Sequence, residues 1–206
     1  NLPPECPDGY EGHRIISEGL PPGSTLEGPA VLTGFTSIVR TLGGTLGGET
    51  QDFDAQLDWT ISGTGDFAGF HRSLSIPVQC AVHTGPRTPG EPIQTFDQVV
   101  WSMQGELFGD PDFCVLRVTA GNAHGLPSPG QTTLSELPSG DFNVDSFFDI
   151  TYRIEFQGAP GSALEGLSGD AVGSMRVSQG PPPLPPQPVF GLPHAPLGEA
   201  CLEQTA

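Results

Sequence analysis

Residues 139–157 read SGDFNVDSFFDITYRIEFQ, and the second half of this stretch alternates strictly between apolar and polar side chains. Successive side chains on a β-strand point to opposite faces, so the alternation predicts a strand with one face on a core and the other in solvent. The inward residues of this strand would be Phe148, Ile150, Tyr152, Ile154 and Phe156. We take it as the central strand of the fold.

The first half of the same stretch carries oxygen-bearing side chains at the spacing of calcium ligands. The residues that match the first, third, fifth and ninth positions of an EF-hand loop are Asp141, Asn143, Asp145 and Asp149. The glycine and the bidentate glutamate of that loop are missing, because Ser146 and Tyr152 stand in their places. Two interpretations remain: a looser surface calcium site, helped by Asp110 or Asp112, or an Asx-rich turn whose side chains bond to their own backbone.

Similar alternation recurs along the chain and predicts an all-β fold. Residues 53–61 and 70–82 alternate most clearly, and no stretch has the apolar period of a helix. About eight or nine short strands separated by glycine- and proline-rich turns are typical of a single antiparallel β-sandwich, of jelly-roll or immunoglobulin-like kind. We expect three segments: a proline-rich N-terminal arm (1–29), the sandwich (30–180) and a proline-rich C-terminal arm (181–206).

The four cysteines, without a CxxC pair, favour disulfides over a zinc site. Cys80 and Cys114 are each in phase with the inward residues of their predicted strands, so we expect them to form a bridge. Cys6 and Cys201 lie in the two arms, where they pair within one chain, the preferred alternative, or link neighbouring chains. An even number of cysteines, behind a first residue that is not Met, predicts a processed protein in an oxidising compartment.

The charge of the chain argues against nucleic acid as a partner. Its 206 residues include seven arginines and no lysine, with a formal net charge of -17, so no basic patch is available for a phosphate backbone. No apolar run approaches the roughly 20 residues needed to cross a bilayer, so we expect no membrane insertion. These features are typical of a secreted or cell-surface protein.

No catalytic motif stands out in the sequence. The five histidines are isolated, and the chain has no nucleophile elbow, phosphate-binding loop or dinucleotide-binding glycine motif. A glycosidase pair of carboxylates stays open, because its two members can come from distant strands. We expect a non-enzymatic protein that needs no cofactor, unless calcium binds.

Three stretches together resemble a known kind of module: LSIPVQCAVHTGPRTPGEPIQTF (74–96), GDPDF (109–113) and GLPSPGQTTLSELPSGDFNVDSFFDITYRIEFQGAPGSALEG (125–166). They are similar to a β-rich module that recurs in secreted, often multi-module proteins of environmental bacteria. The resemblance covers about residues 20–180 and implies an exported bacterial protein. It carries over no activity and no catalytic residue.

The C-terminal arm suggests how such a protein acts. Its prolines are followed by apolar residues and a cysteine, which is unusual for a simple linker, and the predicted anchors are Val189, Phe190, Leu192 and Leu197. We expect an extracellular structural protein, a self-assembling surface or filament subunit whose arms contact a neighbouring copy. The alternative is a secreted carbohydrate-binding module that binds extracellular glycan. Trp59 and Trp101 are in inward phases, which favours the core for both and leaves Tyr10 and Phe67 as candidates for stacking on sugar.

Overall fold

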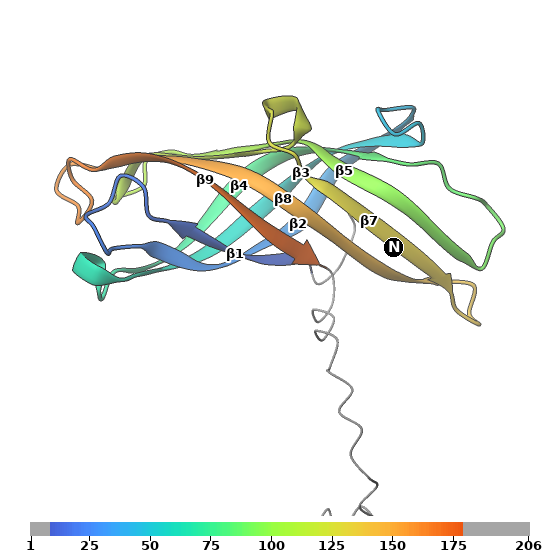
Figure 1. The fold of residues 1–206 in the computed structure, drawn as a ribbon, viewed down its shortest axis with the longest axis horizontal. Coiled ribbons are helices and arrows are strands. Elements are labelled where there is room, and N and C mark those ends of the chain that lie inside the picture. Colours follow the sequence, from blue (N-terminus) through green and yellow to red (C-terminus); the bar gives the residue numbers. More distant parts are fainter. Residues whose placement is uncertain (1–8, 179–206) are drawn as a thin grey trace, which may run out of the picture.

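The computed structural model describes residues 9–178, which form nine β-strands and two single-turn 3₁₀ helices (Figure 1). The all-β prediction is confirmed, and all the strand pairings are antiparallel. The strands are β1 (Tyr10–Ile16), β2 (Leu26–Leu42), β3 (Glu49–Gly63), β4 (His71–Thr84), β5 (Ile93–Leu107), β6 (Phe113–Ala120), β7 (Pro129–Glu136), β8 (Phe142–Gly158) and β9 (Ser168–Ser178). The helices are η1 (Gly65–Phe67) and η2 (Asn122–His124).

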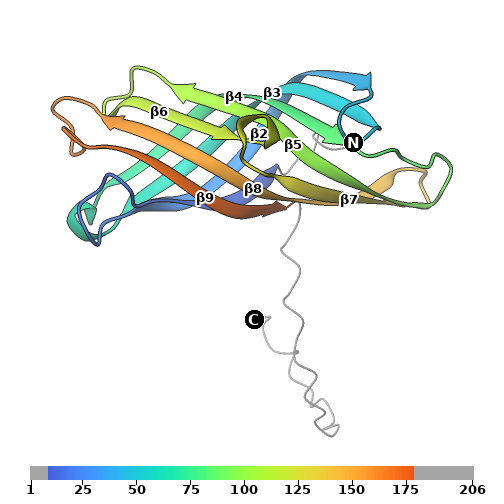
Figure 2. The same cartoon turned by 45° about the horizontal axis from the view of Figure 1, so that its top comes forward.

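All nine strands belong to one sheet, in the order β4-β3-β2-β1-β9-β8-β6-β5-β7. Because β4 also pairs with β5, the sheet curves round and closes on itself (Figure 2). β6 and β7 share one position in this ring, since both lie between β5 and β8 and pair with different halves of these strands. The sandwich detail of the prediction is not confirmed, because the pairings join every strand into a single closed sheet around one core.

The ring is joined most weakly where β1 meets β9. A single residue pair, Glu11 with Ser178, links the two strands. Farther along β1, the Tyr152 hydroxyl lies 3.4 Å from the backbone nitrogen of Ile15 and accepts its hydrogen bond. Because β1 is part of the ring, the sheet begins at Tyr10 and includes residues that we had expected in the N-terminal arm.

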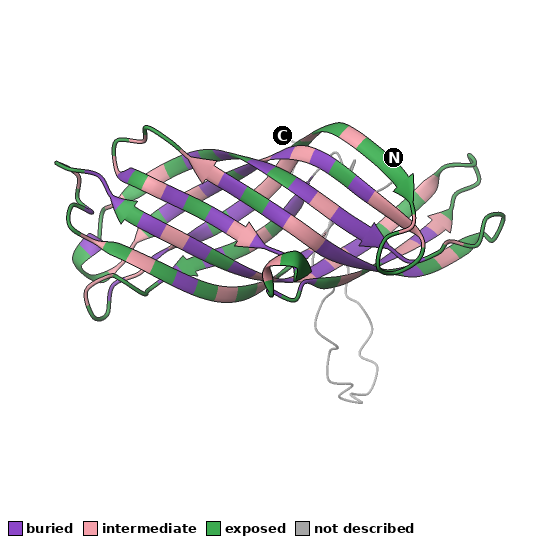
Figure 3. Cartoon of the chain, turned by 90° about the horizontal axis from the view of Figure 1, so that it is seen from above, coloured by how far each residue is buried: buried purple, intermediate pink, exposed green. Residues whose placement is uncertain are grey.

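Buried and exposed residues alternate along the strands (Figure 3). The buried apolar residues belong to one core cluster, so their face of the sheet is the inside of the ring. The alternation predicted for β3 is confirmed, since its inward residues are all buried: Phe53, Ala55, Leu57, Trp59 and Ile61. The predicted central strand is β8, which pairs with β6, β7 and β9 and buries all five of its predicted inward residues. These side chains fill the core that holds the sheet together, because removing apolar surface from water is the main force that stabilises such a fold.

One end of the ring, which we call the packed end, is sealed by four connecting loops. Phe113 at the start of β6 and Leu164 within one of these loops are both fully buried. The loops are bonded to one another, for example by the backbone N–H of Ala159, which donates to the carbonyl oxygen of Asp112 at 2.8 Å. Backbones approach so closely at Gly158 that a Cβ there would lie 1.8 Å from the carbonyl oxygen of Leu164, so only glycine fits. The loops are residues 17–25, 64–70, 108–112 and 159–167.

The opposite end, which we call the open end, lacks strand pairing on one side. Residues 33–42 of β2 extend beyond β1 and pair only with β3. Residues 142–146 of β8 extend beyond β9 and pair only with β7. Within residues 9–178, these two strand edges therefore have no partner strand. Glu11 and Ser178 pair beside them, so the described chain both enters and leaves the sheet at this end.

Candidate functional site: the interior at the open end

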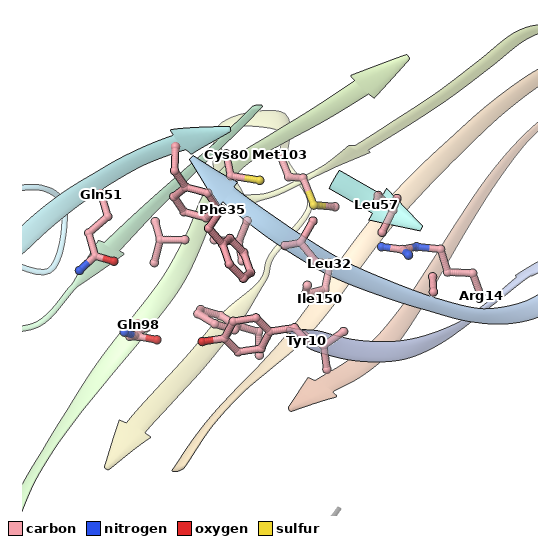
Figure 4. Close-up of a pocket in the computed structure, with 16 residues that line it drawn as sticks. Tyr10, Arg14, Leu32, Phe35, Gln51, Leu57, Cys80, Gln98, Met103 and Ile150 are labelled. Carbon is pink, nitrogen blue, oxygen red and sulfur yellow. The ribbon is translucent and has the colours of Figure 1, made fainter. Parts of the chain in front are cut away.

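A cavity of about 40 Å³ lies inside the closed sheet (Figure 4). A cavity needs about 10–15 Å³ to hold one water, so this one is larger than a single-water site. Most of its wall is apolar, with Phe35, Leu57, Met103 and Ile150 among the lining residues. The strongly polar side chains in the wall are few, namely Tyr10, Arg14, Gln51 and Gln98.

Arg14 is the charged member of this group. It points inward from β1, in phase with Tyr10 and Ile16, and is only 2% exposed. Its Nε and Nη1 atoms have no hydrogen-bond partner among the described residues. The guanidinium lies over the ring of Tyr152, 5.6 Å from the ring centroid, a cation–π contact. Burial lowers the pKa of Arg14 from 12.5 to about 10, against a smaller opposite effect of Tyr152, so the side chain is still a cation at neutral pH.

A chain of buried hydrogen bonds crosses the wall away from Arg14. The hydroxyl of Thr132 donates to Oε1 of Gln98 at 2.9 Å and lies 2.8 Å from the hydroxyl of Ser146. The Tyr10 hydroxyl lies 3.4 Å from that same serine hydroxyl. Gln51 is buried nearby on β3, and its Oε1 has no partner in the described part of the chain. Figure 4 shows Arg14 and the two glutamines at opposite ends of the group, with apolar side chains between them.

This arrangement is suited to holding a molecule rather than to reacting with it. A protonated guanidinium donates hydrogen bonds but cannot act as a base or nucleophile. Cys80 also lines the cavity, and burial, with a smaller contribution from Asp54, raises the pKa of its thiol to about 12. A thiol with such a pKa stays protonated at neutral pH, and the thiolate is the reactive form.

Half-buried apolar side chains surround the open end. They are Phe35, Ile38, Phe142 and Val144. Phe35 meets the rings of Tyr10 and Phe53 edge-on, at centroid distances of 6.2 and 5.7 Å. All four belong to the strand portions that lack a partner on one side. Among residues 9–178, the surface here therefore combines backbone donors and acceptors that have no partner strand with apolar side chains.

The predicted disulfide between Cys80 and Cys114 is wrong. Both are free thiols in the structure, with Cys80 buried and Cys114 exposed. A β-bulge between Phe113 and Val115 shifts the phase of β6, so Phe113 points inward and Cys114 points outward. The two cysteines are also far apart, because Cys80 lies level with Ala120 through Met103, and six residues of β6 span about 20 Å. A bridge needs Cα atoms less than about 7 Å apart.

The predicted calcium site is not assembled either. Asn143, Asp145 and Asp149 lie on β8 itself, so Asn143 and Asp149 are about 20 Å apart along the strand and cannot share one ion. Asp149 instead binds Arg176 at 2.6 Å, which lowers the pKa of its carboxyl group. Asp141 sits in the preceding turn and accepts a hydrogen bond from the Ser139 hydroxyl at 3.0 Å. Among residues 9–178, no group of three or more His, Cys, Asp or Glu side chains is placed to hold a metal ion.

The carboxylates proposed as helpers of that site have another partner. Asp110 and Asp112 both pair with Arg72 at the packed end, with 2.6 Å between Arg72 Nη2 and Asp110 Oδ2. Asp110 also accepts hydrogen bonds from the backbone N–H groups of Asp112 and Phe113, at 2.9 and 3.2 Å. This cluster fastens a loop to β4, so its oxygens are already used by arginine and backbone donors.

The two tryptophans lie in different surroundings. Trp59 is buried in the core as predicted. Trp101 is the extra residue of a bulge in β5, between residues that pair with Ala81 and Val82, and is half-buried. Its ring stacks on His83 at a centroid distance of 4.8 Å, so one of its faces is covered. Tyr10 and Phe67, the other candidates for stacking on sugar, are both buried.

Several sequence predictions concern residues outside the described range. These are the arm anchors Val189, Phe190, Leu192 and Leu197 and the cysteines Cys6 and Cys201. Within residues 9–178, no helix has the length and apolar character to cross a bilayer. No family model, curated protein or solved structure matches this chain.

The sequence analysis missed the polar residues of the cavity. Arg14 lies in a segment, EGHRIIS, whose neighbouring Ile15 and Ile16 are both apolar, so its inward phase was ambiguous. Tyr10 and Ile16 are in phase with Arg14 at period two, and this spacing is the one signal that could have placed the arginine inside. Gln51 and Gln98 had no such signal, because a lone glutamine next to a strand is ordinarily exposed.

Proposed function

We propose that this protein is a non-enzymatic extracellular structural subunit that assembles by adding a strand from a neighbouring copy to its open end. The observation that carries the proposal is the pair of unpartnered strand edges, residues 33–42 of β2 and 142–146 of β8. A strand edge with free N–H and C=O groups is a template for pairing with another chain. Strand addition of this kind obtains affinity from main-chain hydrogen bonds and specificity from side-chain pockets.

The side chains beside these edges support an apolar donor strand. Phe35, Ile38, Phe142 and Val144 are half-buried, so an added strand with apolar residues on one face would cover them. Val39 and Leu42 are 56% and 91% exposed on the β2 edge. Long exposed edges are usually protected by charge or by proline, and residues 33–42 contain one charged residue, Arg40, and no proline.

The proposed donor is the segment 181–206 of the neighbouring copy. Its predicted anchors include Phe190 and Leu192, which are two residues apart and would face the same side of an added strand. Its last ten residues, 197–206, contain no proline and so can donate hydrogen bonds throughout. Because the chain leaves the sheet beside the open end, a donor segment starts near the edge of its own subunit and can cross to the next.

Deletion and edge mutation test this proposal. We expect the full chain to form oligomers in light scattering coupled to size exclusion, in both oxidising and reducing buffer, and the chain lacking residues 181–206 to be monomeric. Val39→Lys places a charge on the β2 edge and should weaken assembly. Phe108→Lys is the matched control, because Phe108 is 76% exposed at the packed end and the charge change is the same. Assembly by the truncated chain, or equal loss in both lysine variants, would refute the proposal.

A further inference from the structure

Among residues 9–178, no carboxylate pairs with Arg14. Five other arginines form ion pairs with carboxylates, and these are Arg72, Arg87, Arg117, Arg153 and Arg176. Arg14 is buried, and its guanidinium lies over the face of the Tyr152 ring, 5.6 Å from the ring centroid. An isolated buried charge is unfavourable unless something compensates it. The orphaned Nε and Nη1 donors of Arg14 therefore point to a missing acceptor.

The space beside Arg14 limits what that acceptor can be. The cavity of about 40 Å³ holds more than one water and less than a long acyl chain without rearrangement of its wall. The guanidinium supplies a single positive charge, which matches a monoanion rather than a phosphate dianion. Leu57, Met103 and Ile150 form the adjoining wall and suit an apolar body. Methionine side chains adapt their shape readily, so Met103 can make room for an additional carbon or two.

We propose that the cavity is a binding site for a short-chain monocarboxylate, with the carboxylate on Arg14 and the alkyl part against Leu57, Met103 and Ile150. Arginine and carboxylate form short, charge-assisted hydrogen bonds, which are stronger than hydrogen bonds between neutral groups. The buried amide of Gln51 and the hydrogen-bonded chain from Gln98 to Tyr10 lie beyond the alkyl part. They would hold an accompanying water beside the alkyl end of the ligand. This site does not depend on assembly, because all its residues come from one chain.

The test is a ligand series on the full-length protein. Thermal unfolding is followed with the sodium salts of formate, acetate, butyrate, hexanoate and octanoate, with sodium chloride at equal ionic strength and with 1-butanol as the uncharged analogue of butyrate. We expect a saturable rise in Tm for acetate or butyrate, a smaller one for formate and octanoate, and none for chloride or 1-butanol. A ligand that binds only the folded state must raise Tm in this way. If butyrate and 1-butanol raise Tm equally, the charge plays no role in binding. If chloride and butyrate raise Tm equally, the site does not recognise a carboxylate.

Variants separate Arg14 from general effects of the salts. Arg14→Met should weaken binding of the best ligand about tenfold or more, since it removes charged hydrogen bonds. Arg153→Met is the control, because Arg153 is exposed and pairs with Asp170 at 3.4 Å on the outer face, and it should bind the ligand like the wild type. Retention of the Tm response in Arg14→Met would refute the site.

A spectroscopic measurement on the wild type covers the case in which Arg14→Met does not fold. The chain has only seven arginines, so their Nε–H signals can be resolved by ¹H–¹⁵N NMR. We expect one Nε–H signal, that of Arg14, to move in a saturable way as the carboxylate is added. Uniform small shifts of all the arginine signals, or none, would contradict binding at Arg14.

Discussion

The two ends of the closed sheet are built on opposite principles. At the packed end, Phe113 and Leu164 are fully buried, and the loops there are bonded to one another. At the open end, apolar side chains such as Phe35 are half-buried, and the strand edges of β2 and β8 are unpaired. The packed end therefore combines buried apolar side chains with hydrogen-bonded loops. The open end has partly exposed apolar side chains and strand edges without a partner strand among residues 9–178.

This difference separates stability from function within one sheet. Fully buried side chains contribute about 1.5–3 kcal/mol each to folding, so the packed end can compensate for unfavourable features elsewhere. Unfavourable features toward the open end include an orphaned oxygen on Gln51 and exposed apolar residues such as Val39, whereas the buried charge on Arg14 lies two residues from the packed-end terminus of β1. Natural proteins usually depart from good packing and full hydrogen bonding at functional sites. We therefore place the function in the half that is packed less well.

Phenylalanine truncation at the two ends should give the largest contrast. We expect Phe113→Ala to lower the free energy of unfolding by about 3–5 kcal/mol, because it opens a cavity in a fully buried site. Phe35→Ala removes a ring that is only partly buried, so the loss should be smaller, about 1 kcal/mol. Urea unfolding followed by tryptophan fluorescence measures both. If Phe35→Ala costs as much as Phe113→Ala, then the open end is as tightly packed as the other.

Removal of the buried charge should act in the opposite direction. In the absence of ligand, we expect Arg14→Met to raise the free energy of unfolding by about 1–3 kcal/mol, because a similar-sized apolar side chain replaces an uncompensated cation. Chemical denaturation of both proteins in carboxylate-free buffer measures the change. A loss of stability would mean that Arg14 has partners that compensate its burial.

The pH dependence of this difference identifies its cause. The folded chain releases the Arg14 proton at a pKa of about 10, and the unfolded chain near the ordinary value of 12.5. Between these values the unfolded state binds more protons, so the contribution of Arg14 to stability rises with pH. The free energy of unfolding of Arg14→Met should therefore exceed that of the wild type by less as the pH rises through about 10. Cys80 is present in both proteins, so its titration cancels when their free energies of unfolding are subtracted. A difference in stability that does not change with pH would exclude desolvation of Arg14 as its cause.

Removing an ion pair should also lower the free energy of unfolding more at the packed end than on the exposed face of the sheet, by smaller amounts. Arg72 is partly shielded where it holds Asp110 and Asp112 at the packed end, so Arg72→Gln should lower the free energy of unfolding by about 1 kcal/mol. Arg176 and Asp149 are more exposed, at 53% and 47% of their side-chain surface, so Arg176→Gln should leave stability unchanged within error. Thermal and urea unfolding at low and high salt distinguish the two, since only the exposed pair is strongly screened. A larger effect of Arg176→Gln would contradict this order.

The strands were predictable because their signal is local. Leu74, Ile76 and Val78 are buried on β4 as their alternation predicts. Pro77 interrupts this stretch and lies one residue outside the β4–β5 pairing, which starts at Val78. Closure of the sheet was not predictable, because it depends on β4 meeting β5 and β1 meeting β9 in space. No local pattern distinguishes such a ring from two stacked sheets, as both have one buried face.

The predicted site failed for a related reason, which is that single-residue irregularities reverse the phase of a strand. One extra residue at Cys114 turns that side chain outward, and one at Trp101 moves its ring onto His83. A bulge changes which face every later residue occupies, and nothing in the sequence marks its position. The calcium prediction failed because the spacing of Asp141 to Asp149 was interpreted as a loop, whereas the strand already begins at Phe142.

The smallest effect on stability, and a clear test of the bulge, should come from Cys114. Its side chain is exposed and unpaired by disulfide, so Cys114→Ser should leave the free energy of unfolding unchanged within error. In the native protein Cys114 should react quickly with a thiol reagent, whereas Cys80, buried and with its thiol pKa raised to about 12, should react only on unfolding. Mass spectrometry of peptides labelled before and after denaturation, without a reductant, reads both sites separately. If the cysteines were bridged, neither would be labelled in the native or the denatured protein, and Cys114→Ser would lower stability by about 3–4 kcal/mol.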